Sequence, residues 1–169
     1  MMGTYLPPGY QLLISLVKSV IWPDHIHEAE SLLLSDKQID AHLKMLSAEG
    51  WDRLFKQATE QGLLAIVWDA LQKRSSKAGA VWENPCQGIP RPLRIGWELS
   101  VRHIEEVYRL QRQVLKELAE IFNKEGLQVM LLKGLGLASL YPRPEHRESG
   151  DLDIYLYGGF EKGNKLIED

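Results

Sequence analysis

The longest periodic stretch of this sequence, residues 93–123, constrains the fold more than any other feature. Its apolar side chains recur at alternating spacings of four and three, with polar Gln111 at the one interrupted step. This is the period of an α-helix with an apolar face. The main stripe comprises Trp97, Val101, Ile104, Tyr108, Leu115, Leu118 and Phe122, and a second comprises Val107, Leu110, Val114 and Ile121. We expect a helix about 45 Å long, buried along both stripes inside a helical domain.

Shorter helices are predicted before this one. They cover residues 10–22, 36–47 and 51–74, and a loop rich in proline and glycine follows at residues 75–92. Ser35 and Asp36 can cap the second helix, and Gly62 divides or kinks the third. The five tryptophans fall mostly at apolar helical positions or loop edges, which is typical of packing residues. They are Trp22, Trp51, Trp68, Trp82 and Trp97.

The periodicity changes after residue 125. Strands are predicted at 127–132 and 151–157, helices at 134–140 and 160–169, and a loop at 141–150. The fold class is therefore α+β and mostly helical, with a helical region at residues 1–125 and a β-α-β-α unit at residues 126–169. Because a two-stranded sheet is marginal by itself, we expect the chain to be an N-terminal portion, truncated at its C-terminus.

Two acidic residues, Asp151 and Asp153, begin the second predicted strand. Residues i and i+2 of a strand point to the same face, so both carboxylates can reach one cleft. Mg²⁺ prefers oxygen ligands and is commonly held by one or two carboxylates together with substrate phosphates. The pair therefore predicts a site for Mg²⁺ or Mn²⁺, with Asp151 and Asp153 as metal ligands and catalytic residues.

The candidates for binding a nucleotide are four residues that precede the aspartates in the sequence. Gly134 and Gly136 let the backbone approach a phosphate at the start of a helix, where free N–H groups favour anions. Lys133 and Arg147 supply positive charge, although Arg147 could instead neutralise the two carboxylates. This combination is typical of metal-assisted nucleotidyl or phosphoryl transfer.

Taken singly, these features have simpler explanations, namely a solvated strand edge, a tight turn and ordinary surface charges. Their order between two strands favours a site. A dinucleotide-binding fold fits poorly, because Ser139 stands at the third glycine position and prolines interrupt the connecting helix. The histidines do not lie at metal-ligand spacing, but His146 adjoins Arg147 in the loop before the aspartates.

The composition excludes several other classes of protein. The formal net charge is −3 and the arginines of residues 91–112 alternate with acids, so a nucleic-acid partner is not expected. Cys86 is the only cysteine, which excludes an internal disulfide and is compatible with a reducing, cytoplasmic location. No apolar run approaches the length of a membrane span, and we expect no membrane partner. The sequence is silent on oligomeric state.

Several of these motifs together resemble a known family. Leu132-Lys133-Gly134, Leu140-Tyr141-Pro142, Arg147 and Asp151-Leu152-Asp153-Ile154 resemble a bacterial family of uncharacterised nucleotidyltransferase-like proteins. That family belongs to the superfamily that includes DNA polymerase beta. The helical lead-in, with its long helix before the first strand, is similar too.

The resemblance implies a metal-dependent transfer of a nucleotidyl group from an NTP to an unknown acceptor. It also implies that residues 126–169 begin a nucleotidyltransferase core, with Gly134 as the turn that faces the phosphates. Two departures matter: Gly134-Leu135 replaces the usual Gly-Gly or Gly-Ser, and the third carboxylate of the superfamily is absent, so this chain alone should be weakly active or inactive. The alternative is a non-catalytic helical protein-interaction module with a vestigial nucleotidyltransferase platform.

Overall fold

The computed structural model describes residues 8–22, 33–79 and 84–168. It contains two compact units, Met1–Val101 and Arg102–Asp169. Helix α5 (Arg91–Lys124) contributes its first residues to one unit and the remainder to the other. The domain boundary expected at residue 125 was placed where the helical periodicity ends, whereas these two units are defined by their compactness. The expected boundary therefore stays a prediction.

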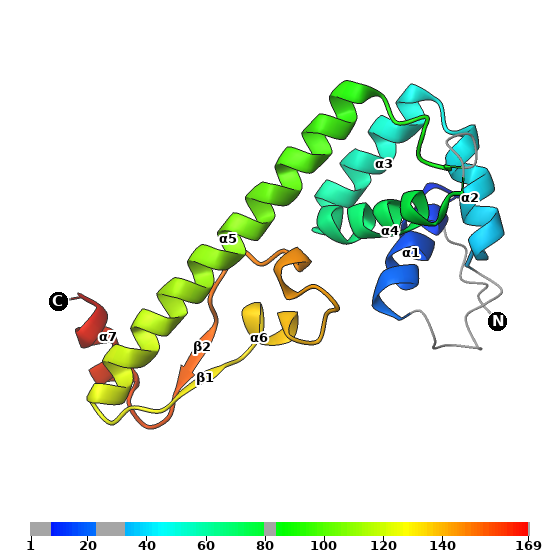
Figure 1. Cartoon of the computed structure of the whole chain (residues 1–169). Coiled ribbons are helices and arrows are strands. Elements are labelled where there is room, and N and C mark those ends of the chain that lie inside the picture. The colour runs from blue at the N-terminus through cyan, green and yellow to red at the C-terminus, as the bar shows by residue number, and fades with distance from the viewer. Residues whose placement is uncertain (1–7, 23–32, 80–83, 169) are drawn as a thin grey trace. The chain divides into compact units, whose positions relative to one another are not determined.

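The N-terminal unit is helical (Figure 1). Its helices are α1 (Pro8–Ile21), α2 (Asp36–Met45), α3 (Ala48–Glu60) and α4 (Leu64–Lys77), followed by the beginning of α5. Helix α1 packs mainly against α4, and it also contacts α2 and α3. The buried core of this unit is made of apolar side chains from all five helices, among them Leu13, Leu16, Leu43, Trp51, Val67, Leu71 and Trp97.

Local signals in the sequence set the helix ends. The side chain of Ser47 accepts a hydrogen bond from the Gly50 N–H at the start of α3. After α3, Gly62 adopts a φ of 63°, and the N–H groups of Gly62 and Leu63 bond the carbonyls of Thr59 and Ala58. This glycine-dependent C-cap reverses the chain. Gly62 therefore divides the region into two helices, which was one of the two expected outcomes.

Trp97 anchors the start of α5 to the helical core. Its side chain is fully buried, and its indole N–H donates to the Leu64 carbonyl at 3.1 Å. The ring stacks on Trp68 and meets the edge of Phe55. The expectation that tryptophans pack is confirmed for Trp51, Trp68 and Trp97. It is wrong for Trp22, which is 53% exposed, and Trp82 lies outside the described residues.

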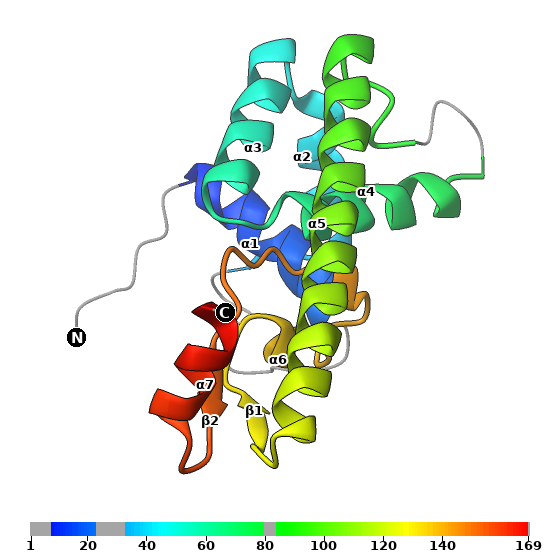
Figure 2. The ribbon, with the colours of Figure 1, turned by 90° about the vertical axis from the view of Figure 1, so that its left-hand side faces the viewer.

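The C-terminal unit joins the rest of α5 to two strands and three short helices (Figure 2). These are β1 (Val129–Leu131), α6 (Leu135–Ala138), the 3-10 helix η2 (Pro144–His146), β2 (Ile154–Leu156) and α7 (Phe160–Glu168). The strands pair antiparallel, with Met130 opposite Tyr155. The mostly helical α+β class is confirmed.

A second glycine C-cap turns the chain from α5 into the strands. Gly126 has a φ of 74°, and the Gly126 and Leu127 N–H groups bond the carbonyls of Asn123 and Phe122. Phe122 is completely buried, and Gly163 of α7 lies beside both its ring and Leu156. The absence of a side chain at position 163 lets α7 approach this point closely.

The second apolar stripe of α5 does not pack as expected. Leu110, Val114 and Ile121 are 40–46% exposed. The main stripe lies toward the strands and the loop, because residues such as Phe122 and Gln111 contact those segments. A helix presents only one line of side chains to a narrow two-stranded ribbon, so periodicity overestimated the width of the buried face.

The strands are shorter than expected. Residues 151–153 precede β2 rather than opening it, and β1 begins two residues late. Backbone bonds from Leu132 N–H to the Asp153 carbonyl and from Tyr157 N–H to the Gln128 carbonyl nevertheless extend the pairing by one step at each end. By this register, Asp153 lies on the same face of the ribbon as Tyr155, which is 48% exposed.

Candidate functional site

The Lys133-Gly134 bend lies directly against the segment that carries the aspartates. Gly134 has φ 61° and ψ −114°, a conformation open only to glycine in practice. A Cβ placed on Gly134 would lie 2.9 Å from the Asp151 carbonyl oxygen and 2.6 Å from Ser149 Oγ. Residues separated by 17 positions in the sequence are therefore in backbone contact, as the candidate site requires.

Lys133 links the bend to the second aspartate. Its ammonium nitrogen lies 3.3 Å from Asp153 Oδ2, and the two side chains are 67% and 34% exposed. An ion pair this exposed contributes little to stability, about 0–1 kcal/mol, and exchanges readily with solvent. Lys133 can therefore leave Asp153 for a phosphate, and Asp153 can then accept another cation.

Arg147 braces the bend rather than the carboxylates. Its Nη1 donates to the Gly134 carbonyl at 3.1 Å and to the Glu148 carbonyl at 3.4 Å, and its guanidinium lies over the Tyr141 ring. Among the described residues, no ion pair joins Arg147 to Asp151 or Asp153, and Asp153 pairs with Lys133 instead. Of the two roles considered for Arg147, neutralisation of the acids is thus the less suitable.

Gly136 has a packing role. It lies within α6, and a Cβ there would approach the Leu131 carbonyl at 3.3 Å and the Leu131 side chain at 3.4 Å. Helix α6 has only four residues, so its dipole adds little attraction for an anion. The structure thus brings the Lys133-Gly134 bend against the Asp151 backbone and the Asp153 carboxylate, bonds Arg147 to the Gly134 carbonyl, and places Gly136 against β1.

Two residues missed by the sequence argument hold this arrangement in place. Gln111 of α5 donates from Nε2 to the Ser149 and Gly150 carbonyls, at 2.9 and 3.2 Å. Ser149 donates from Oγ to the Asp151 carbonyl at 3.2 Å. The signal for Gln111 was present, because it is the polar residue at the interrupted step of an apolar stripe. Its long-range partner could not be inferred from periodicity.

A polar cluster secures the loop before the aspartates to α5. His146 is 1% exposed and its Nε2 lies 2.9 Å from Glu105 Oε1. The same oxygen accepts from Arg143 Nη2 at 3.1 Å. His146, which adjoins Arg147 in the sequence, therefore forms a buried link between η2 and α5.

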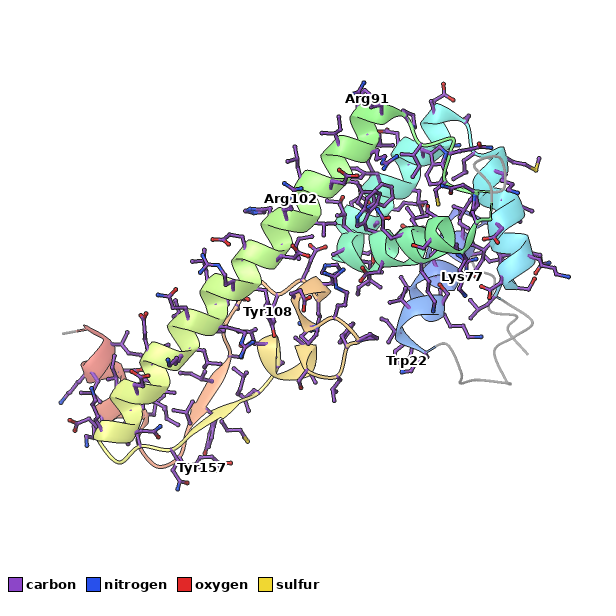
Figure 3. All side chains as sticks on the ribbon, in the orientation of Figure 1. Trp22, Lys77, Arg91, Arg102, Tyr108 and Tyr157 are labelled. Atoms are coloured by element: carbon purple, nitrogen blue, oxygen red, sulfur yellow. The ribbon has the colours of Figure 1, made fainter. Side chains whose placement is uncertain are left out.

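A hollow of about 300 Å³ adjoins this loop. Its walls come from α5 and from the four residues before Asp151, and they include Ile104, Val107, Tyr108, Arg147 and Ser149. Figure 3 labels Tyr108 on α5. The mixture of apolar surface and polar groups is typical of a small-molecule site. Its lining includes Gly150, the neighbour of Asp151.

The two carboxylates fit magnesium only with additional ligands. Within the described residues, no group of three or more His, Cys, Asp or Glu side chains is arranged to hold a metal ion. Asp151 is exposed and Asp153 is partly exposed, so water and phosphate oxygens can reach both. Two accessible carboxylates suit a cation that keeps its waters and binds together with a triphosphate.

Comparison with known proteins identifies the family of this chain. The model of a family described as "Uncharacterised nucleotidyltransferase" matches residues 47–168. Searches of the curated proteins and of the solved structures found no match. Across the described residues, no helix combines the length and the apolar character needed to cross a membrane. The match covers most of the chain, including both aspartates and the Lys133-Gly134 bend, and the chain therefore belongs to this nucleotidyltransferase family.

Proposed function

We propose that this domain transfers a nucleotidyl group from an NTP to an acceptor, with a divalent cation held by Asp151 and Asp153. The observation that carries the proposal is the contact of the Gly134 backbone with the Asp151 carbonyl, together with the Lys133–Asp153 ion pair. These contacts bring a glycine bend and an exposed ammonium group against the Asp151 backbone and the accessible Asp153 carboxylate. Family membership supports the same reaction class.

The reaction would form a bond between an acceptor oxygen and the α-phosphorus of the NTP. The bond from that phosphorus to the β-phosphate bridging oxygen would break, and pyrophosphate would leave. A bound Mg²⁺ or Mn²⁺ would neutralise charge on the triphosphate. Lys133 would move from Asp153 to a phosphate oxygen, and the bend at Gly134 would let the backbone approach the phosphates closely.

We expect this chain to bind a nucleotide but to catalyse nucleotidyl transfer weakly or not at all. Within the described residues, no third His, Cys, Asp or Glu joins Asp151 and Asp153 in an arrangement that could hold a metal. The resemblance implies three, and the missing one would activate the acceptor or hold a second cation. Binding is therefore the more direct test of the site, and the acceptor has to be sought separately.

Isothermal titration calorimetry with Mg²⁺ and each NTP tests the proposal. The Asp151→Asn/Asp153→Asn variant should lose metal-dependent binding. Glu117→Gln/Glu120→Gln is a matched control, because it removes the same charge from exposed positions on α5. Equal heats from the wild type and the aspartate variant would exclude these carboxylates as the metal site.

A non-catalytic interaction module is the second candidate. The exposed line of Leu110, Val114 and Ile121 on α5 favours it, since exposed apolar side chains in a row are typical of interaction surfaces. Under this alternative, a partner captured by the wild type should be lost when the three residues become serine. It should be retained by the Asp151→Asn/Asp153→Asn variant.

A further inference from the structure

The N-terminal unit contains a second hollow that the proposed reaction does not use. It has a volume of about 510 Å³ and lies between α1, α2 and α4. Its lining includes the buried side chains of Ser15, Ile39, Ala70 and Arg74. This volume is in the range of sites for small molecules, and its lining reaches the core rather than lying wholly on the surface.

Arg74 organises one wall of this cavity. Its side chain is only 8% exposed, and its Nη1 and Nη2 each lie 2.6 Å from a carboxylate oxygen, of Asp40 and Asp36 respectively. The guanidinium thereby ties α4 to α2. One positive charge is shared by two carboxylates, so this group of three residues carries a formal charge of −1.

Three lysines in the lining add enough positive charge to outweigh this negative charge. Lys18, Lys73 and Lys77 line the same cavity, and Lys73 donates to the Ser19 carbonyl at 3.3 Å. Among the described residues of the lining, four cationic side chains and two carboxylates give a formal charge of +2. Trp22 also contributes to its lining and is 53% exposed, and Figure 3 marks both Trp22 and Lys77. We call this site the lysine cavity.

Lys73 and Lys77 also influence a carboxylate in the lining of the lysine cavity. The pKa of Asp36 is lowered chiefly by its hydrogen bond to Arg74, and the charges of Lys77 and Lys73 lower it further. Both ammonium groups therefore lie close enough to influence a carboxylate at the start of α2. The N-terminus of that ten-residue helix adds positive potential at the same place.

We propose that the lysine cavity binds a phosphate monoester of a small organic molecule. A phosphate dianion matches the formal charge of +2 on the described lining residues, and it can accept hydrogen bonds from several lysines at once. The cavity exceeds the volume of a phosphate group, and Trp22 and Leu34 provide apolar surface for an organic part. The simpler alternative is a solvated ion-pair cluster that only joins α2 to α4.

Binding is measured by following the Trp22 indole N–H in two-dimensional NMR spectra. The probes are inorganic phosphate, ribose 5-phosphate, AMP and uncharged adenosine. We expect saturable shifts with at least one phosphate monoester, with an affinity about tenfold higher than for inorganic phosphate. Adenosine should produce no saturable shift. Equal affinities for the esters and inorganic phosphate would overturn the assignment to an ester.

Two variants separate a specific site from general attraction. Lys73→Gln/Lys77→Gln should weaken ester binding about tenfold or more. Lys37→Gln/Lys44→Gln removes the same charge from α2 outside the lysine cavity and should bind like the wild type. Equal weakening in both variants, or saturation unaffected by either, would refute the proposal.

The aspartate variant distinguishes this site from the proposed reaction. Asp151→Asn/Asp153→Asn should bind the ester normally without metal, because its changes lie in the C-terminal unit. Loss of ester binding in that variant would assign the signal to the nucleotidyl site and overturn the proposal. Failure of Mg²⁺ binding at the aspartates would leave the ester result unchanged.

Discussion

Gly134→Ala tests whether the glycine bend is required for both the fold and the site. Gly134 combines a φ of 61° with a ψ of −114°, where an L-residue is strained. The added methyl group would also lie 2.9 Å from the Asp151 carbonyl oxygen. Neither problem can be relieved by rotating a side chain, because one is in the backbone of residue 134 and the other meets the backbone of residue 151.

The two effects have a size that can be worked out. A non-glycine residue in a sparsely populated region costs about 1–3 kcal/mol. Ordinary van der Waals contact begins at 3.4 Å, so the two segments must separate by about 0.5 Å, which adds a further cost of about 1 kcal/mol. We expect Gly134→Ala to lower the free energy of unfolding by about 2–4 kcal/mol.

Two other glycines provide matched controls. Gly126 has a φ of 74° but nothing within 4 Å of an added Cβ, so Gly126→Ala should cost only the backbone strain, about 1–2 kcal/mol. Gly96 lies in α5 with nothing within 4 Å, and Gly96→Ala should stabilise the helix by about 0.5–1 kcal/mol. Urea denaturation followed by circular dichroism gives all three values.

Metal binding supplies the second readout. Because the methyl group displaces Asp151, folded Gly134→Ala should bind Mn²⁺ about tenfold more weakly than the wild type, whereas Gly96→Ala should bind it normally. The reasoning fails if Gly134→Ala is no less stable than Gly126→Ala. It also fails if folded Gly134→Ala keeps the Mn²⁺ affinity of the wild type while Asp151→Asn/Asp153→Asn loses Mn²⁺ binding.

Three further outcomes are expected. Gln111→Leu removes both hydrogen bonds to the carbonyls of the loop before Asp151, and the NMR order parameters of the Ser149 and Gly150 backbone should fall while those of α2 are unaffected. The pKa of Asp36 is held below 3.8 in the folded state by Arg74, so its stabilising effect is present above that value and disappears as the pH falls through the folded pKa. Acid unfolding of Asp36→Asn should therefore show a weaker pH dependence, measured by circular dichroism from pH 6 downward. Burial raises the pKa of the Cys86 thiol, and a thiol reagent should label it only at the rate of unfolding, whereas labelling as fast as a free peptide thiol would contradict its burial.

Some of this architecture could be read from local signals. The 3.6-residue period located α5 to within two residues at its N-terminal end, and Gly62 and Gly126 marked chain reversals because only glycine readily takes a positive φ. Strand bounds were less accurate. Three paired residues in each strand are too few to produce a clear alternation of apolar and polar side chains.

The candidate site was only partly accessible to the same reasoning. Asp151, Asp153, Lys133 and Gly134 could be selected because phosphate and metal chemistry requires those residue types in that order. The packing of Gly136 against Leu131 could not be foreseen, because it depends on how α6 folds back on β1, and the expected role of Gly136 in nucleotide binding stays a prediction. Arg147 was ambiguous for a similar reason, as its acceptors are backbone carbonyls that carry no signal in a sequence.

The sequence by itself determined where helices form, where glycine must reverse the chain, and which residues have the chemistry to hold a metal and phosphate. Tertiary structure decided which faces are buried, that Gln111 and Glu105 of α5 secure the loop before the aspartates, and that Arg74 joins two acids within a cavity lined by lysines. The physical reason is the distance along the sequence over which each kind of interaction acts. Backbone conformation responds to neighbours a few residues away, whereas burial and hydrogen-bond partners depend on segments that meet only after the chain has folded.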